Sequence, residues 1–318
     1  MRILVTGGLG VNGVWVVQKL LERGLEPIVA DIRQDFSLAP DLEAKVDFQT
    51  LDVTNMENVE QVLAQSKVAA IIHLAAFIDP EMDHEPFRAF RVNSLGTVNL
   101  LEAARNSHVR RFVSASSRAV YGATPEGVGE PHYQSIPETY PKRPVKAYDV
   151  TKLGSEQMGQ VYRDVYGLEF AALRFAGIYG PGKQARHGKM SLRSRLVEDP
   201  VKGIPVRVER GGDQKDDMIY VDDGAEALVR AVLADALPHS AYNIGSGKGQ
   251  TLREVADAVR AAVPGADIYI GPGLNPLGFD VHRSAVFDCS LAHQDFGYSP
   301  KFDLMHGIAD YVRHLRSP

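Results

Sequence analysis

The sequence predicts an α/β fold built on a doubly wound parallel sheet, with a smaller lobe toward the C-terminus. Three observations lead to this prediction. Short apolar runs alternate with longer helix-like stretches through the first half, a glycine-rich turn follows the first run, and the rhythm ends near Gly180. Continuous apolar runs are typical of strands buried on both faces of a parallel sheet, and the helical stretches between them serve as crossovers.

The main sheet is predicted to use six of these runs: Arg2–Gly7, Pro27–Ile32, Val46–Val53, Ala70–Ala75, Arg111–Ser116 and Glu169–Phe175. Beyond Gly180, the loops are rich in Gly, Pro and charge, and shorter strands are predicted at Val206–Glu209, Tyr242–Ile244 and Ile268–Ile270. We therefore assign residues 1–175 to the sheet domain, to which residues 218–245 return, and residues 176–217 and 246–318 to the second lobe.

Composition limits the classes of function. The 318 residues carry a net charge of −5, which indicates no broad cationic face for nucleic acid or a membrane surface. The single cysteine, Cys289, cannot form an intrachain disulfide, and the histidine spacing predicts no metal site. No apolar run approaches the roughly 18 residues that span a bilayer, and a first strand beginning at Arg2 leaves no room for a signal peptide. We expect a cytoplasmic protein.

The turn after the first strand contains two overlapping glycine motifs within "VTGGLGVNG". G-x-G-x-x-G runs through Gly8, Gly10 and Gly13, and G-x-x-G-x-x-G begins at Gly7. Such a turn lets backbone N–H groups approach a pyrophosphate at a helix N-terminus, although a purely structural strand-to-helix turn is the alternative. The residues expected to contact a dinucleotide here are Gly7, Gly10, Val11, Asn12 and Gly13.

Two carboxylates follow the next strands. Asp31 lies 18 residues beyond Gly13, where it would accept hydrogen bonds from the adenosine ribose and repel a 2′-phosphate, which favours NAD over NADP. Arg33 is interpreted as a solvated loop charge, although a guanidinium there would accept a phosphate. Asp52 would accept from the adenine amino group, or it would cap the helix that follows.

The stretch "AYDVTK" places Tyr148 and Lys152 four residues apart, on one face of a predicted helix. A neighbouring ammonium favours the phenolate, and a tyrosine with a lowered pKa can serve as a general base near neutral pH. An exposed pair without a role is the alternative. Ser117, at the C-terminal end of a predicted parallel strand, would hydrogen-bond the same substrate oxygen, because ligands bind at that edge of open α/β sheets.

With these residues in view, the chain resembles the extended short-chain dehydrogenase/reductase family, a group of NAD-dependent sugar epimerases and dehydratases with a Rossmann fold and a substrate-binding lobe. The resemblance covers nearly the whole chain, through "VTGGLGVNG", "HLAA", "VNSLGTVNLLEAA", "SSRAVYG", "YDVTK", "LRFAGIYGPG", "MIYVDDGAEALV" and "YNIGSG". It implies that Ser117, Tyr148 and Lys152 are catalytic, with Tyr148 and Lys152 also contacting NAD. Further cofactor contacts are implied at Val53, which packs on adenine, at Ala75 and at Asn93 near the nicotinamide.

Departures from the family pattern bear on the substrate. The acid and base of the dehydratases are replaced by Arg118 and Ala119, so dehydration is not expected. Nucleotide-sugar enzymes usually have an asparagine at Gly177 and an arginine at Asp216 to hold the diphosphate, and their loss argues against a UDP-sugar. Arg118 would grip a carboxylate or phosphate, or it would turn into the loop network.

The segment "KQARHGKM" carries Lys183, Arg186, His187 and Lys189 and is interpreted as a solvated loop, with a cationic lid over the substrate as the alternative. Arg118, Gly177 and His187 are our candidate substrate residues. On the predicted helix 148–166, an apolar stripe either faces the sheet or builds the homodimer that the resemblance implies; its members are Val150, Leu153, Met158, Val161 and Val165.

We therefore predict a hydride-transferring enzyme that uses NAD at a secondary alcohol carbon of a sugar or sugar acid. Net dehydrogenation and epimerisation remain open. A UDP-sugar 4-epimerase with an atypical diphosphate site is one alternative. A non-catalytic NAD-binding regulator is another, but such proteins commonly lose the Tyr or Lys that this chain keeps.

Overall fold

A computed structural model of the chain describes residues 1–78, 84–124, 128–280 and 283–316. In this part of the chain, seven strands form one parallel sheet in the order β11-β7-β5-β4-β1-β2-β3. The strands are β1 (Arg2–Thr6), β2 (Glu26–Asp31), β3 (Asp47–Thr50), β4 (Ala70–His73), β5 (Arg111–Ser117), β7 (Glu169–Phe175) and β11 (Ala241–Ile244).

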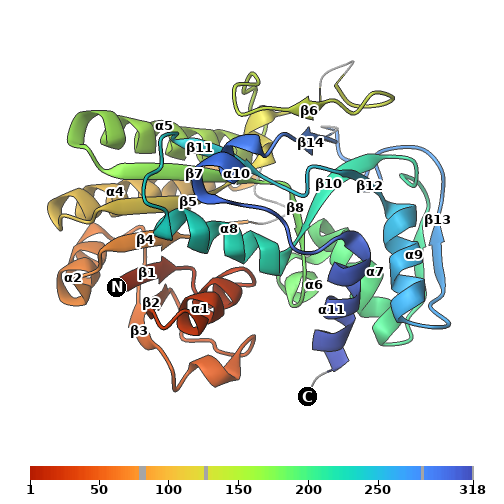
Figure 1. Cartoon of the computed structure of the whole chain (residues 1–318), viewed down its shortest axis with the longest axis horizontal. Coiled ribbons are helices and arrows are strands. Elements are labelled where there is room, and N and C mark those ends of the chain that lie inside the picture. The colour runs from red at the N-terminus through yellow and green to blue at the C-terminus, as the bar shows by residue number, and fades with distance from the viewer. Residues whose placement is uncertain (79–83, 125–127, 281–282, 317–318) are drawn as a thin grey trace.

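Helices cover both faces of this sheet, as a doubly wound fold requires (Figure 1). One face packs against α1 (Gly13–Glu22), α8 (Val221–Leu233) and α10 (Ser290–Phe296). The other packs against α2 (Met56–Ser66), α4 (Gly96–Asn106) and α5 (Ala147–Tyr166). Alternate residues of β1 enter the two cores: Ile3 and Val5 join the first, and Leu4 joins the second. All three are fully buried, which explains the uninterrupted apolar runs.

The predicted strands agree with this sheet, with two differences. The third is shorter than predicted, because β3 is an edge strand and its residues are only half-buried or exposed. The fourth ends at His73, because the chain leaves the sheet there and runs along a cavity beside the glycine turn. The strand near residue 242 returns to the main sheet as β11, which pairs with β7.

The chain after β7 builds a second apolar core, at the right of Figure 1. Its strands are β8 (Gly177–Tyr179), β9 (Val206–Val208), β10 (Lys215–Tyr220), β12 (Gly249–Thr251) and β13 (Ile268–Ile270). Its helices are α6 (Lys183–His187), α7 (Leu192–Val201), α9 (Leu252–Ala262) and α11 (Leu304–Arg316). Strand β10 joins β8 in parallel, which attaches this lobe at the end of β7.

Smaller elements complete the fold. Short strands β6 (Ser135–Ile136) and β14 (Val286–Phe287) pair in parallel. Helix α3 (Pro86–Ala89) continues into a π-helical segment, Phe90–Leu95, and single 3-10 turns lie at Pro40–Leu42, Arg118–Tyr121 and Gly188–Ser191. Among the described residues, no helix has the length and apolarity needed to cross a membrane.

Candidate functional site

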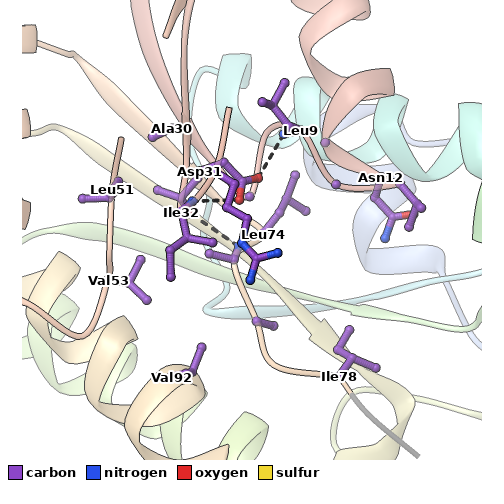
Figure 2. Close-up of a pocket in the computed structure, with 18 of the residues that line it drawn as sticks. Leu9, Asn12, Ala30, Asp31, Ile32, Leu51, Val53, Leu74, Ile78 and Val92 are labelled. Atoms are coloured by element: carbon purple, nitrogen blue, oxygen red, sulfur yellow. Dashed lines mark hydrogen bonds between the residues drawn. The ribbon is translucent and has the colours of Figure 1, made fainter. Parts of the chain in front are cut away.

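A cavity of about 480 Å³ opens beside the β1–α1 turn, at the carboxyl ends of the central strands. Figure 2 shows side chains from the β1–α1 turn, from β2, and from the segments after β3 and β4 around it. Nine of the predicted cofactor residues line it: Gly7, Gly10, Val11, Asn12, Gly13, Asp31, Asp52, Val53 and Ala75. Residues that our sequence analysis did not single out also contribute, among them Leu9, Ile78, Arg88 and Val92.

The positions of the turn require glycine for different physical reasons. Gly7 has φ +67°, and a Cβ atom there would lie 2.7 Å from the Ala75 nitrogen. A Cβ atom at Gly13 would lie 2.2 Å from the Gly7 carbonyl oxygen, so the protein's own backbone excludes side chains at both positions. At Gly10, the only contact of such an atom within 4 Å is that same oxygen, at 3.1 Å. Packing alone scarcely requires glycine at position 10, and its bare backbone leaves the cavity wall open to a phosphate group.

Asp31 is held at the end of β2 by the turn it faces. Its carboxylate accepts hydrogen bonds from the backbone N–H of Leu9, at 3.2 Å, and of Ile32, at 2.8 Å (Figure 2). Burial raises the pKa of Asp31, while these two bonds oppose the rise. The exposed Arg33 also lines the cavity. This arrangement presents a fixed acceptor to a ribose hydroxyl.

Asp52 does not cap the following helix. The N-cap of α2 is Asn55, whose side chain accepts from the N–H of Asn58, so the capping alternative for Asp52 is wrong. The Asp52 carboxylate instead accepts from the backbone N–H and hydroxyl of Thr54, and the residue lines the cavity.

Tyr148, Lys152 and Ser117 come together where β5 meets α5. The Ser117 side chain accepts a hydrogen bond from the backbone N–H of Ala119 and is close enough to the Tyr148 phenol to lower its pKa. Lys152 is buried, and its Nζ donates to the Ala115 carbonyl oxygen at 2.8 Å and lies 5.7 Å from the centroid of the Tyr148 ring. None of the three lines the 480 Å³ cavity.

The pKa of the Tyr148 phenol is raised, whereas the sequence predicts that it is lowered. Burial raises the pKa of Tyr148 to about 12, although the neighbouring Ser117 side chain opposes the rise. The Lys152 ammonium donates to the Ala115 carbonyl rather than to the phenol, and burial lowers its own pKa to about 8. Ser117 and Lys152 are therefore beside Tyr148 as predicted. Their presence does not lower the pKa of Tyr148 below its usual value, because the effect of burial is larger than theirs.

Asn93 does not line the cavity. Its amide is buried and holds the backbone of Phe77, accepting from the N–H at 2.7 Å and donating to the carbonyl at 3.1 Å. It also donates to the Thr151 hydroxyl of α5. The residue therefore ties the segment after β4 to the helix that carries Tyr148.

The segment 183–189 is not a simple solvated loop. Lys183 is 3% exposed, and its Nζ lies 2.7 Å from the Asn12 side-chain oxygen in the glycine turn. His187, a predicted substrate residue, instead lines the cavity with the predicted cofactor residues, and burial lowers its pKa to about 4. Arg186 reaches Asp35 beyond β2. The Lys189 side chain lies outside the described part of the structure.

The remaining predicted substrate residues meet a residue that we did not predict. Arg118 forms an ion pair with Asp216, and Arg193 of α7 pairs with the same carboxylate. A Cβ atom at Gly177 would lie 2.7 Å from Nη1 of Arg193. No local pattern marks Arg193, because its partners come from distant parts of the chain.

A network of buried polar groups holds together the elements that carry the site. Arg174 of β7 forms a bidentate pair with Glu156, one turn beyond Lys152 on α5, with Nη2 at 2.7 Å from Oε2. Ser116, next to Ser117, donates to the same carboxylate. This network fixes β5, β7 and α5 relative to one another. In the described residues, no group of three His, Cys, Asp or Glu side chains is placed to hold a metal ion.

Comparisons with known proteins agree with this geometry. A model of the NAD-dependent epimerase/dehydratase family matches residues 3–245. A UDP-glucose 4-epimerase of Mycolicibacterium smegmatis is 32% identical over 325 residues, covering 100% of this chain and 99% of that protein. A mitochondrial L-threonine 3-dehydrogenase of Bos taurus is 28% identical over 313 residues, covering 95% of this chain and 79% of that protein.

A solved structure extends the likeness to three dimensions. UDP-glucose 4-epimerase of Thermus thermophilus, in complex with NAD, matches with a TM-score of 0.83 at 33% identity and covers 100% of this chain and 99% of that one. The matching fold, the cavity beside the glycine turn and the end-to-end similarity agree with one another. This chain is therefore an NAD-dependent enzyme and belongs to the NAD-dependent epimerase/dehydratase family.

Proposed function

We propose that the enzyme transfers hydride between NAD and a secondary alcohol carbon of a sugar or sugar acid, with Tyr148 as general base. The observation that carries this proposal is the convergence of three side chains: the Lys152 ammonium lies 5.7 Å from the centroid of the Tyr148 ring, and Ser117 acts on the same phenol to lower its pKa. The three side chains lie at the carboxyl end of β5, where open α/β sheets bind their ligands.

In this proposal NAD lies in the 480 Å³ cavity, with its pyrophosphate over Gly10 and its adenosine ribose at Asp31. When bound, it supplies the hydride acceptor and a positive charge that favours ionisation of a nearby phenol. Tyr148 takes the proton of the substrate hydroxyl at its own oxygen, and Ser117 orients that hydroxyl. Lys152 stays fixed on the Ala115 carbonyl, and Asn93 acts only as a positioning residue.

Replacing Tyr148 by Phe tests the base. Turnover should fall by about 10² to 10⁴, the usual contribution of a general base, whereas NAD affinity should scarcely change. Tyr166→Phe is the matched control, because Tyr166 lies on the same helix and is 52% exposed. Full activity in Tyr148→Phe would overturn the proposal.

A UDP-sugar 4-epimerase is the second candidate, favoured by the end-to-end similarity to UDP-glucose 4-epimerases. The two differ in the fate of the reduced cofactor. A dehydrogenase releases NADH, which accumulates with its absorbance band, whereas an epimerase keeps the cofactor and returns the hydride. Absorbance of the purified enzyme, followed during turnover with sugars, sugar acids and UDP-glucose, distinguishes them.

We also propose that the enzyme is a homodimer. Four members of the predicted apolar stripe on α5 do not face the sheet: Val150, Met158, Val161 and Val165 are exposed, whereas Leu153 is half-buried. Phe87 and Phe90, from the neighbouring segment before α4, are exposed as well. Clustered apolar side chains of this kind mark an interaction surface rather than a core, so the alternative that the stripe packs on the sheet is wrong for these four residues.

A further inference from the structure

Arg193 occupies the space that a side chain at position 177 would need. A Cβ atom at Gly177 would lie 2.7 Å from Nη1 and 2.9 Å from Cζ of Arg193. Gly177 begins β8 and pairs with Met218 of β10, and Asp216 stands two residues before Met218 on the same strand. The absence of a side chain at Gly177 therefore lets the Arg193 guanidinium approach the strand that carries Asp216.

Asp216 gathers two guanidinium groups from separate elements. Arg118 follows β5 directly, and Arg193 projects from α7, yet both donate to the Asp216 carboxylate. The Asp216 side chain is only 6% exposed. Asp217, the next residue, is occupied elsewhere, because it accepts from Ser246, Gly247 and Phe287. Arg118, Arg193 and Asp216 together carry a net charge of +1, and the neighbouring Asp217 carboxylate also acts on Arg193.

The cluster retains many hydrogen-bond donors. Each guanidinium has five N–H groups, and in the described part of the chain Asp216 is the only acceptor recorded for either arginine. Nε of Arg193 is buried and has no partner among the described residues. Two guanidinium groups share one carboxylate here, so donors remain for an additional acceptor from outside the chain.

The cluster stands next to the proposed catalytic groups. Arg118 directly follows Ser117, so their Cα atoms are about 3.8 Å apart. Arg118 also lines a small cavity of about 20 Å³ together with Arg283, Tyr121 and Tyr140. Arg283 pairs with Asp149, the neighbour of Tyr148 in the chain. The charge of Arg283 also acts on the Tyr148 phenol. In this proposal, an anionic group held at Arg118 and Arg193 belongs to the molecule whose hydroxyl meets Tyr148.

We propose that Arg118 and Arg193, oriented by Asp216, bind the carboxylate of a small hydroxy acid substrate. This inference rests on the proposed function and narrows its substrate class to the acid. A carboxylate brings one negative charge and planar acceptors that match the guanidinium fork. A nucleotide diphosphate would bring two negative charges close to the Asp216 carboxylate, which repels them.

Matched substrate pairs test the carboxylate site. NADH formation is measured with D-glucuronate against D-glucose and with D-gluconate against D-glucitol, and kcat/KM is compared within each pair. We expect the acid to be favoured by about 10²-fold, because charge-assisted hydrogen bonds of roughly 2 to 3 kcal/mol are lost with the neutral partner. Arg193→Gln should remove most of this preference by raising KM for the acid alone.

Two further variants serve as a control and as a substitute for Arg193→Gln. Arg195→Gln is the matched control, because Arg195 lies on the same helix but donates to the Arg207 carbonyl, and it should keep the acid preference. If Arg193→Gln unfolds, Arg118→Gln is the second variant: it removes the other guanidinium, leaves Arg193 paired with Asp216, and should likewise lose the preference. Unaltered NAD affinity, measured by calorimetry, shows that each variant is folded.

The outcomes separate this inference from the proposed function. Equal kcat/KM for acid and neutral partners, or an acid preference that survives in Arg193→Gln, would overturn the carboxylate site and leave hydride transfer standing. Absence of turnover with every compound would contradict the proposed function instead. Calorimetric titration of D-glucuronate into the NAD-loaded enzyme and the Arg193→Gln variant then decides: weaker binding to the variant supports the site, and equal or absent binding overturns it.

Discussion

Lys183→Met should change how the stability of the enzyme depends on pH. Lys183 is 3% exposed, and its ammonium has one hydrogen bond, to the Asn12 side chain at 2.7 Å. The pKa of the neighbouring His187 is lowered to about 4, first by burial and then by the charge of Lys183, so His187 is neutral near pH 7 and does not compensate the charge. Burial lowers the pKa of Lys183 from 10.5 to about 7.

The sign follows from proton binding in the two states. Between pH 7 and pH 10.5 the unfolded chain keeps the Lys183 proton while the folded chain has lost it, so the free energy of unfolding rises with pH. Between pH 6 and pH 9.5 this rise amounts to about 3 kcal/mol, at roughly 1.36 kcal/mol for each pH unit above 7. Methionine has a similar length and does not titrate, so Lys183→Met should lack this contribution.

Urea unfolding of both proteins at pH 6 and pH 9.5 measures the difference. The wild-type enzyme should gain about 3 kcal/mol more than the variant, whatever other groups contribute, because those groups are common to both. Lys45→Met provides the control, because the Lys45 side chain is 57% exposed and forms an ion pair with Asp41, four residues earlier. Parallel pH dependence in the wild type and Lys183→Met would refute the reasoning.

Three other predictions concern the cofactor cavity, the buried network and the dimer. Gly10→Ala should lower NAD affinity at least about 10-fold while changing the free energy of unfolding by less than about 1 kcal/mol. Gly13→Ala should unfold the protein, because its Cβ atom would lie 2.2 Å from a backbone oxygen. Calorimetry measures the NAD affinity and thermal unfolding the stability; equal losses of stability in the two variants would contradict this prediction. Glu156→Gln should cost about 3 kcal/mol in urea unfolding by leaving the buried Arg174 charge unpaired, and a loss under about 1 kcal/mol argues against this role. Val161→Glu should convert a dimer into a monomer in sedimentation, and a wild-type monomer at micromolar concentration removes the proposal.

Local patterns were sufficient to predict the main sheet. Its strands are buried on both faces, so each appears as an uninterrupted apolar run, and Arg111 and Glu169 open β5 and β7 at the predicted positions. The same argument fails at β3, where an edge strand lacks cover and the apolar run extends beyond the paired residues. The glycine turn was predictable in part from contacts within the turn itself, since a Cβ atom at Gly13 would lie 2.2 Å from the carbonyl oxygen of Gly7.

Side chains whose environment depends on distant segments were not predictable. Lys183 is buried against Asn12, 171 residues earlier, and nothing in "KQARHGKM" distinguishes it from a solvated lysine. The apolar stripe on α5 shows the same limitation, because helical spacing predicts one apolar face but not whether that face meets the sheet or solvent. Only the position of the helix relative to the sheet shows that Val161 and Val165 point outward, with Val165 64% exposed.

Arg118 and Arg193 show why the meaning of a departure from a family pattern becomes clear only in the structure. In the sequence, Gly177 and Asp216 look like two independent losses of a donor and a cation. In the structure they are coupled, because the space over Gly177 admits Arg193, and Asp216 holds that arginine beside Arg118. The positive charge therefore lies on Arg118 and Arg193 rather than at position 216, and the Asp216 carboxylate neutralises part of it. If the carboxylate site that we propose exists, this arrangement is the physical reason why a chain similar to a UDP-glucose 4-epimerase would prefer a carboxylate to a diphosphate.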